Sequence, residues 1–334
     1  MATVLLLLCL TLACSAFPSS LSLVNNSELD WKFHSFPTQP DFALLASLIN
    51  LNNKKGKIVA YTNSPSSGSA DTPGVTWEAS TLPNARSVQK GGNLIWSKKT
   101  DLLGKTPPSR IHSDAAIMTW NPQFGGLTRY TLHAVIMFGG LTTANEVLGD
   151  TWVYTETTAQ TSWSDESSRV GAVVPSPRYG HTLASVGFSD PGAPFVVMFG
   201  GANHYKKDPG AKTLGDTWVL ASVWNTGDGS THSFEWQNVA IPPGNNTSPP
   251  RRYKQAMASH GQPTNGKGVL ASIFRSVMFG GCADVHCKTL LSDTWIFAST
   301  PNMEASVSPS TQLLSVSWSW KQIRSTRDHP SGRR

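Results

Sequence analysis

Charged residues are scarce in this chain: only 14% of its 334 residues are Asp, Glu, Lys or Arg. A surface helix needs one polar face, so this scarcity disfavours a protein built of amphipathic helices. Residues that suit turns and strands are abundant instead, with 28 Gly, 22 Pro and 12 Trp. Such a composition is typical of short strands joined by turns. We therefore expect an all-β protein.

The chain also lacks a run of Lys or Arg, alone or interleaved with aromatic residues, although its formal net charge is +6. Nucleic-acid-binding surfaces carry such runs, so we expect no nucleic-acid partner. The positive charge leaves nonspecific attraction to acidic glycans or anionic surfaces open. No nucleophile elbow, His-Glu-X-X-His motif or paired-carboxylate signature is present either. We therefore expect a protein that is not an enzyme and that holds no cofactor and no metal.

Long apolar runs are confined to the N-terminus, where residues 1–16 read MATVLLLLCLTLACSA. This run is too short to span a bilayer and ends in small residues, as signal peptides do. A lipidated Cys14 is the alternative, although TLAC is a poor lipoprotein box. No later run could cross a bilayer. We expect a cleaved signal peptide, no membrane span, and a mature protein in the secretory lumen or outside the cell.

Sequons for N-glycosylation agree with that location, because glycans attach to Asn in Asn-X-Ser/Thr on exposed loops of secreted proteins. The sequons are at Asn25, Asn245 and Asn246. We therefore expect a glycoprotein.

Cysteine is nearly absent after residue 16, because only Cys282 and Cys287 remain, in GCADVHCK. An oxidising compartment favours a local disulfide between them. The alternative is a metal site in which both thiolates join Asp284 and His286, but no second ligand cluster accompanies it. We predict the disulfide.

The chain repeats itself in three segments: AVIMFGGLTTANEVLGDTWVYT (134–155), VVMFGGANHYKKDPGAKTLGDTWVL (196–220) and RSVMFGGCADVHCKTLLSDTWIFA (275–298). Each has an apolar strand ending in Phe-Gly-Gly, a variable loop, and Asp-Thr-Trp followed by β-formers. Each is preceded by a Pro-rich turn with an Arg and followed by another Trp. We interpret each copy as a unit of four strands, a to d. The turn arginines are Arg110, Arg178 and Arg252, and the following tryptophans are Trp163, Trp236 and Trp320.

This combination of a Gly pair, two spaced Trp and a Pro-X-X-Arg turn resembles the kelch repeat. The resemblance implies a kelch-type β-propeller built of four-stranded antiparallel blades. It covers a degenerate blade, which has VTW at Trp77 and no Gly pair, and three fuller ones. The expected blades are 37–99 (degenerate), 100–166, 167–239 and 240–323.

The two flanks of these blades suggest that the ring is incomplete. Segment 17–36 contains Trp31, a candidate for a ring-closing strand, and 324–334 resembles the start of a further blade. Kelch rings usually close with six or seven blades, so we interpret the chain as part of a longer ring. Open edges expose apolar faces, and we expect marginal stability or self-association through the open propeller.

The Gly pair of the central copy allows two readings. Gly200 and Gly201, followed by Lys206 and Lys207, could form a phosphate-binding loop, but such a loop leads into a helix and here a strand follows. The sister copies also lack the lysines. We favour an architectural role, in which glycines supply positive φ or close backbone packing.

The turn arginines also allow two readings. They can pair with the repeated Asp150, Asp216 and Asp293 inside the blades, or grip a ligand carboxylate. The structural role is favoured and the ligand role is retained as the alternative, because the resemblance implies binding through the face bordered by d-to-a and b-to-c loops. The contact candidates in those variable loops are His204, Tyr205, Lys206, Lys207 and His286.

We therefore predict a noncatalytic extracellular module that binds a protein or an extracellular glycan through its propeller loops. Two alternatives stay open. One is the propeller part of a secreted copper-radical oxidase of the galactose-oxidase type, lacking its catalytic remainder. The other is a fragment without independent activity.

Overall fold

The structure of the protein, a computed structural model, describes residues 49–50, 58–62, 73–81, 94–120, 132–156, 160–188, 192–224, 232–241, 248–261, 273–301 and 316–323. Several predictions fall outside these residues. They are the signal peptide 1–16 with Cys14, the segment 17–36 with Trp31, the segment 324–334, and the sequons at Asn25, Asn245 and Asn246.

Every named element in the described part of the chain is a β-strand, so the all-β prediction is confirmed. The strands form four antiparallel meanders of four consecutive strands each, which we call the first to fourth meander. The first contains β1 (Ile49–Asn50), β2 (Ile58–Thr62), β3 (Val75–Thr81) and β4 (Leu94–Lys98). The second contains β6 (Asp114–Trp120), β7 (Leu132–Leu141), β8 (Val147–Glu156) and β9 (Thr161–Asp165). The third contains β10 (Thr182–Phe188), β11 (Gly192–Phe199), β12 (Thr217–Trp224) and β13 (His232–Asn238). The fourth contains β14 (Ala256–Gly261), β15 (Ile273–Phe279), β16 (Thr294–Pro301) and β17 (Val316–Ile323).

Two additional pairings modify this plan. β5 (Leu102–Leu103) adds a short parallel strand to the outer edge of β9, which the repeat did not predict. The third and fourth meanders are joined into one sheet where Gly187 and Phe188 of β10 pair with Phe274 and Ile273 of β15.

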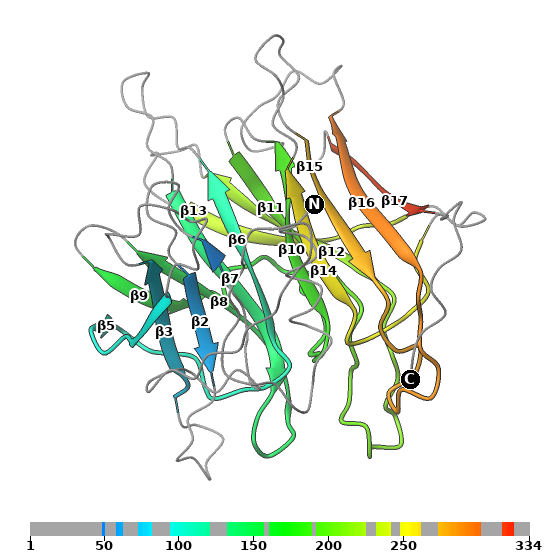
Figure 1. Cartoon of the computed structure of the whole chain (residues 1–334), viewed down its shortest axis with the longest axis horizontal. Coiled ribbons are helices and arrows are strands. Elements are labelled where there is room, and N and C mark those ends of the chain that lie inside the picture. The colour runs from blue at the N-terminus through cyan, green and yellow to red at the C-terminus, as the bar shows by residue number, and fades with distance from the viewer. Residues whose placement is uncertain are drawn as a thin grey trace, which may run out of the picture.

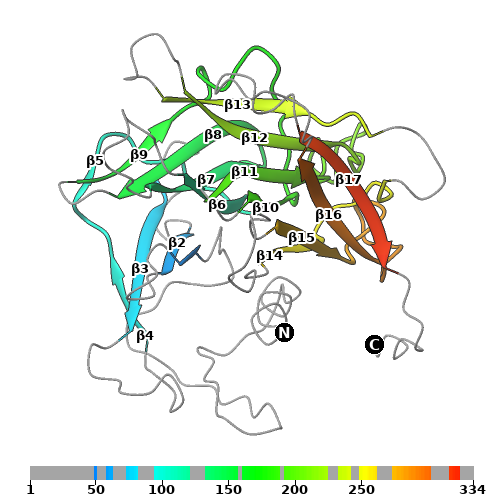
Figure 2. The same cartoon turned by 90° about the horizontal axis from the view of Figure 1, so that it is seen from above.

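The meanders stand side by side along an arc, with their first strands inside and their last strands outside (Figure 2). The loops that join β7 to β8, β11 to β12 and β15 to β16 lie at one end of the molecule, which we call the loop end (Figure 1). No strand pairing between described residues connects the fourth meander back to the first. None of the described residues forms a helix long and apolar enough to cross a membrane.

The core lies between neighbouring meanders, where alternating residues of each sheet face the next. The contact between the second and third meanders includes Ile136, Phe138, Val196, Met198 and Trp236. That between the third and fourth includes Phe199, Val219, Met278, Phe297 and Trp320.

Each contact between meanders also contains one buried indole hydrogen bond. The Trp of a last strand donates its Nε1–H to the Thr that precedes the Trp of the neighbouring third strand. The three bonds are Trp163 to Thr76 at 2.9 Å, Trp236 to Thr151 at 3.1 Å, and Trp320 to Thr217 at 3.0 Å. The repeated Trp and Thr therefore fix how one meander sits on the next.

Candidate binding surface at the loop end

The turn arginine of each repeat is locked inside its own meander. Arg178 has no exposed surface. Its guanidinium donates to both carboxylate oxygens of Asp216 at 2.8 Å and to the Gly200 carbonyl at 3.1 Å. Trp218 Nε1 donates to the same carboxylate at 2.7 Å. Burial alone would raise the pKa of Asp216, but the hydrogen bonds and charge of Arg178 outweigh it and hold that pKa below its usual value.

The same unit recurs in two other meanders, with Arg–Asp distances of 2.6 and 2.7 Å in both. Its members are Arg110, Asp150 and Trp152 in the second meander, and Arg252, Asp293 and Trp295 in the fourth. All three arginines are fully buried, so none reaches the surface that a ligand would touch. Each arginine instead contacts the Asp of its own meander.

In the second and third meanders the first glycine of the pair, Gly139 or Gly200, packs against the turn of the next meander. Gly200 has a φ of 67°, and a Cβ added there would lie 2.4 Å from the carbonyl oxygen of Arg252. The Gly201 N–H donates to that same carbonyl at 2.9 Å, and the Gly200 N–H donates to the Asp216 carbonyl. Both amides are therefore engaged in backbone packing, as the architectural reading of this loop expects.

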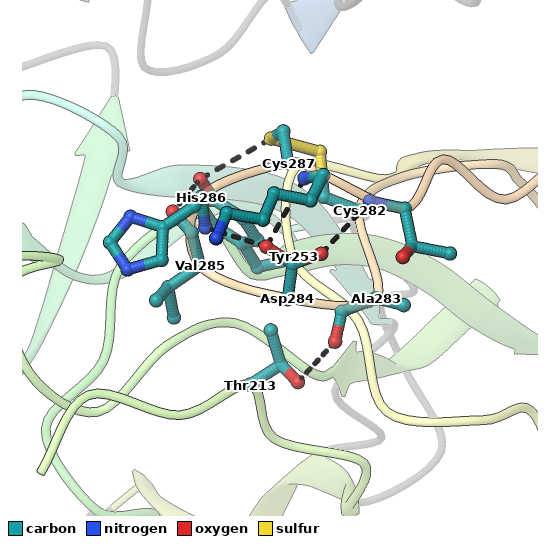
Figure 3. The surroundings of a disulfide bond; sticks show 10 residues. Thr213, Tyr253, Cys282, Ala283, Asp284, Val285, His286 and Cys287 are labelled. Atoms are coloured by element: carbon teal, nitrogen blue, oxygen red, sulfur yellow. Dashed lines mark hydrogen bonds between the residues drawn. A yellow bond between two sulfur atoms is a disulfide. The ribbon is translucent and has the colours of Figure 1, made fainter.

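Cys282 and Cys287 form a disulfide within the loop after β15, which confirms that prediction (Figure 3). The oxygens of Asp284 accept backbone N–H bonds from His286, Lys288 and Thr289. The hydrogen bond from Lys288 is the largest cause of a lowered pKa at Asp284. The carboxylate thus organises its own loop. Among the described residues no group of three His, Cys, Asp or Glu is arranged to hold a metal ion.

The residue two positions after each turn arginine lies at the inner end of its meander and adopts a left-handed backbone. These residues are His112, Gly180 and Lys254, with φ values of 55°, 62° and 56°. They are joined by backbone bonds from Gly180 N–H to the His112 carbonyl at 2.8 Å and from Lys254 N–H to the Gly180 carbonyl at 2.7 Å. Tertiary hydrogen bonds therefore hold two non-glycine residues in a conformation that glycine adopts freely.

Positive charge collects around this row. Burial, followed by the charges of Lys254 and Lys206, lowers the pKa of the His112 imidazole to about 4. Lys254 Nζ lies 5.5 Å from the centre of the Tyr253 ring. The Lys206 amide lies against the hydroxyl of Tyr179, whose pKa is raised to about 12, mainly by burial. We call His112, Lys206 and Lys254 the cationic patch.

Two buried tyrosines support the patch from beneath. The rings of Tyr179 and Tyr253 meet edge to face with centres 6.0 Å apart, and the His112 ring lies 6.2 Å from that of Tyr179. The Tyr253 hydroxyl donates to the Val285 carbonyl at 2.7 Å and lies 3.4 Å from Cys287 Sγ. The disulfide loop therefore braces the patch through Tyr253 (Figure 3).

The predicted contact residues divide among several places. His204 lines an open cleft of about 640 Å³ between the β7–β8 and β11–β12 loops, together with Asn145, Asp208 and Lys212. Tyr205 is half-buried against the tyrosine cluster, whereas Lys206, Lys207 and His286 are exposed. In Figure 3 the His286 imidazole points away from the disulfide. Lys206 alone of this set joins the cationic patch, and the ligand roles of all five stay predictions.

Sequence reasoning missed His112 and Lys254. Their signal is the alignment of the three turns, in which the central copy has Gly180 at the same position. A glycine in one copy indicates that the shared backbone is left-handed, so that a His or Lys in the other copies is unusual.

Comparison with known proteins identifies no family. No family model matches the chain, and no curated protein matches it. Among solved structures, similarity is found to a chain of a cryo-EM structure of RAG in complex with one melted RSS and one unmelted RSS. It covers 86% of this chain and 96% of that chain at 12% identity, with a TM-score of 0.32. At that score the similarity carries no argument about fold or function.

Proposed function

We propose that the protein is a kelch-type β-propeller module that binds an extracellular protein or glycan, without catalysis, through its loop end. The observation that carries this proposal is the cationic patch, where His112 and Lys254 occupy a left-handed backbone. Residues held in a strained backbone conformation cluster at functional sites more often than elsewhere.

The distribution of shared and unshared residues supports a binding role for the loops. The Arg–Asp–Trp unit and the Phe-Gly-Gly sequence recur in the second, third and fourth meanders, and the Arg and Trp of each unit are buried. The loops at the loop end differ in length and sequence: LTTANEVLG, ANHYKKDPGAKTLG and CADVHCKTLLS. Variable loops on a repeated scaffold are where recognition is usually located.

The disulfide supports an extracellular location for this module. Disulfides persist in oxidising compartments, and the pair Cys282–Cys287 is formed here. Because these two cysteines bond to each other, neither offers a thiol for the Tyr–Cys cross-link of a copper-radical oxidase. No observation on the described residues favours the oxidase over the binding module.

The proposal is tested by screening the full mature chain against arrays of extracellular glycans and secreted proteins. For any ligand found, Lys206→Ala combined with Lys207→Ala should weaken binding at least tenfold while the melting temperature stays unchanged. Lys321→Ala, an exposed lysine on β17, is the matched control for charge. Binding that survives substitution of every exposed residue of the three loops would overturn the proposal.

A further inference from the structure

We propose that the cationic patch is a binding site for sulfated or carboxylated glycans. The inference rests on the proposed binding function and assigns a ligand class to its loop end. His112, Lys206 and Lys254 come from three separate segments, yet they converge at the inner end of the second to fourth meanders.

The backbone of the patch is the first argument for this site. Gly180 shows that the shared conformation needs no side chain, and a Cβ there would lie 3.0 Å from the Tyr253 ring. His112 and Lys254 nevertheless carry long polar side chains at the same left-handed position on both sides of it. Because glycine would suit this backbone better, the presence of His and Lys at these positions indicates a role other than folding.

The electrostatics of the patch is the second argument. Lys254 and Lys206 are exposed, and each is close enough for its charge to reach His112. Both lysine charges disfavour protonation of His112, so the imidazole is neutral at neutral pH and the two lysines supply the positive charge of the patch. One acidic side chain, that of Asp208, lies close enough for its charge to reach Tyr179. The patch therefore favours an anionic ligand.

The chemistry of the patch distinguishes a glycan from a peptide. Tight peptide and protein interfaces are centred on an apolar or aromatic anchor that enters a pocket. The apolar side chains beneath the patch are already covered: Leu141 is 2% exposed, Ala202 0% and Val285 6%. Lysines act as point charges that suit single sulfate or carboxylate groups. Bidentate hydrogen bonding to the carboxylate of an acidic peptide would instead require an exposed Arg. The three turn arginines are buried.

The test measures binding of a size-defined heparin-type oligosaccharide to the full mature chain by calorimetry at 0.15 M salt, a near-physiological ionic strength at which long-range attraction is screened. Four other probes are measured in parallel: its desulfated form, which keeps the uronic carboxylates, its desulfated and carboxyl-reduced form, which carries no acidic group, inorganic sulfate, and a poly-glutamate peptide of equal charge. We expect binding of the sulfated or the carboxylated oligosaccharide, and affinities at least tenfold lower for the carboxyl-reduced form, for free sulfate and for the peptide.

One position offers a complete set of variants. Lys254→Gly removes the charge and relieves the backbone, so affinity should fall at least tenfold while the melting temperature is no lower than that of the wild type. Lys254→Arg keeps the charge and should keep affinity within threefold. His112→Gly should lower affinity about threefold without loss of stability, and Lys321→Ala should change neither property.

Three outcomes would overturn the assignment. They are wild-type affinity in Lys254→Gly, equal affinity for the desulfated and carboxyl-reduced oligosaccharide, or tighter binding of the acidic peptide. If the array finds a ligand whose binding resists Lys254→Gly but is lost on Lys212→Ala in the neighbouring cleft, the proposed function stands and this site does not. If no array component binds at all, both fail.

Discussion

The third and fourth meanders share one internal design but differ in how their outer faces are covered. The Arg–Asp–Trp unit has nearly the same geometry in both, with Arg178–Asp216 at 2.8 Å and Arg252–Asp293 at 2.6 Å. The face of the third meander that meets the fourth is fully covered, through Val197, Phe199, Thr217 and Val219. The equivalent residues of the fourth are only half-buried: Val277, Phe279, Thr294 and Ile296.

This difference separates two levels of organisation. The ion pair forms within one meander from residues of the same repeat, so it is the same in the three meanders that carry it. Burial of the face depends on a neighbouring meander that supplies Trp320 and its partners. The ion pairs should therefore contribute equally to the stability of the two meanders, whereas the apolar residues on their faces should contribute unequally.

The largest effect should be the same in both meanders. Asp216→Ala or Asp293→Ala leaves a fully buried guanidinium without its carboxylate, and each should lower the free energy of unfolding by about 3–5 kcal/mol. Urea denaturation of the full chain measures this. The exposed Asp208→Ala is the control and should change stability little. A much smaller loss in the fourth meander would show that the two units are not equivalent.

The apolar faces should respond differently. Phe199 is fully buried and its ring lies 5.2 Å from that of Trp320, so Phe199→Ala should cost about 3–5 kcal/mol. Phe279 is only half-buried, so Phe279→Ala should cost roughly 1–2 kcal/mol, because less apolar area leaves water on folding. The same denaturation experiment compares them. Equal losses would mean that something covers the fourth meander in solution.

The contact between the second and third meanders should also differ from that between the third and fourth in its response to pH. His181, beside Phe138, is fully buried, and burial together with the charge of Arg178 lowers its pKa to about 3. Gln255 holds the equivalent position in the next contact and donates to the Phe199 carbonyl at 2.7 Å. As pH falls below 6.5, the unfolded chain binds a proton at His181 that the native chain binds only near pH 3. Stability is therefore lost over that range, by about 2 kcal/mol at pH 5.

His181→Gln isolates this contribution. The difference in unfolding free energy between variant and wild type should shift by about 2 kcal/mol in favour of the variant between pH 7 and pH 5. His112, with a pKa lowered to about 4, acts in the same direction, whereas Asp114, with a pKa raised to about 7 by burial, acts in the opposite one. Both remain in the variant and cancel in the difference. A pH-independent difference would contradict the buried neutral imidazole.

The smallest effect concerns the indole hydrogen bond. Thr217→Val leaves the Trp320 N–H unpaired and should cost about 1–2 kcal/mol. Thr294 accepts no such bond from a Trp of the described residues, so Thr294→Val should cost less than about 0.5 kcal/mol. An equal loss at both positions would indicate that another indole, such as that of Trp31, reaches Thr294. That result would support the ring-closing role predicted for Trp31.

Much of the fold could be read from the repeat. The four-strand unit, the Arg–Asp pairing, and the disulfide follow from local patterns whose spacing is fixed along the chain. The parallel strand β5 could not be read, because Leu102 and Leu103 pair with β9 from outside the repeat. The cationic patch was also missed, since its members only meet when three meanders align their inner ends.

The sequence alone determined the all-β class, the repeated strands and the residues that lock each meander, because these depend on alternation, turn chemistry and short-range partners. Only the tertiary structure decided that the repeated arginines are buried and which lysines lie close to one another. It did so by stacking the meanders, which buries Arg110, Arg178 and Arg252 and leaves Lys206 and Lys254 exposed beside His112. Burial and convergence are properties of neighbours that lie far apart in sequence.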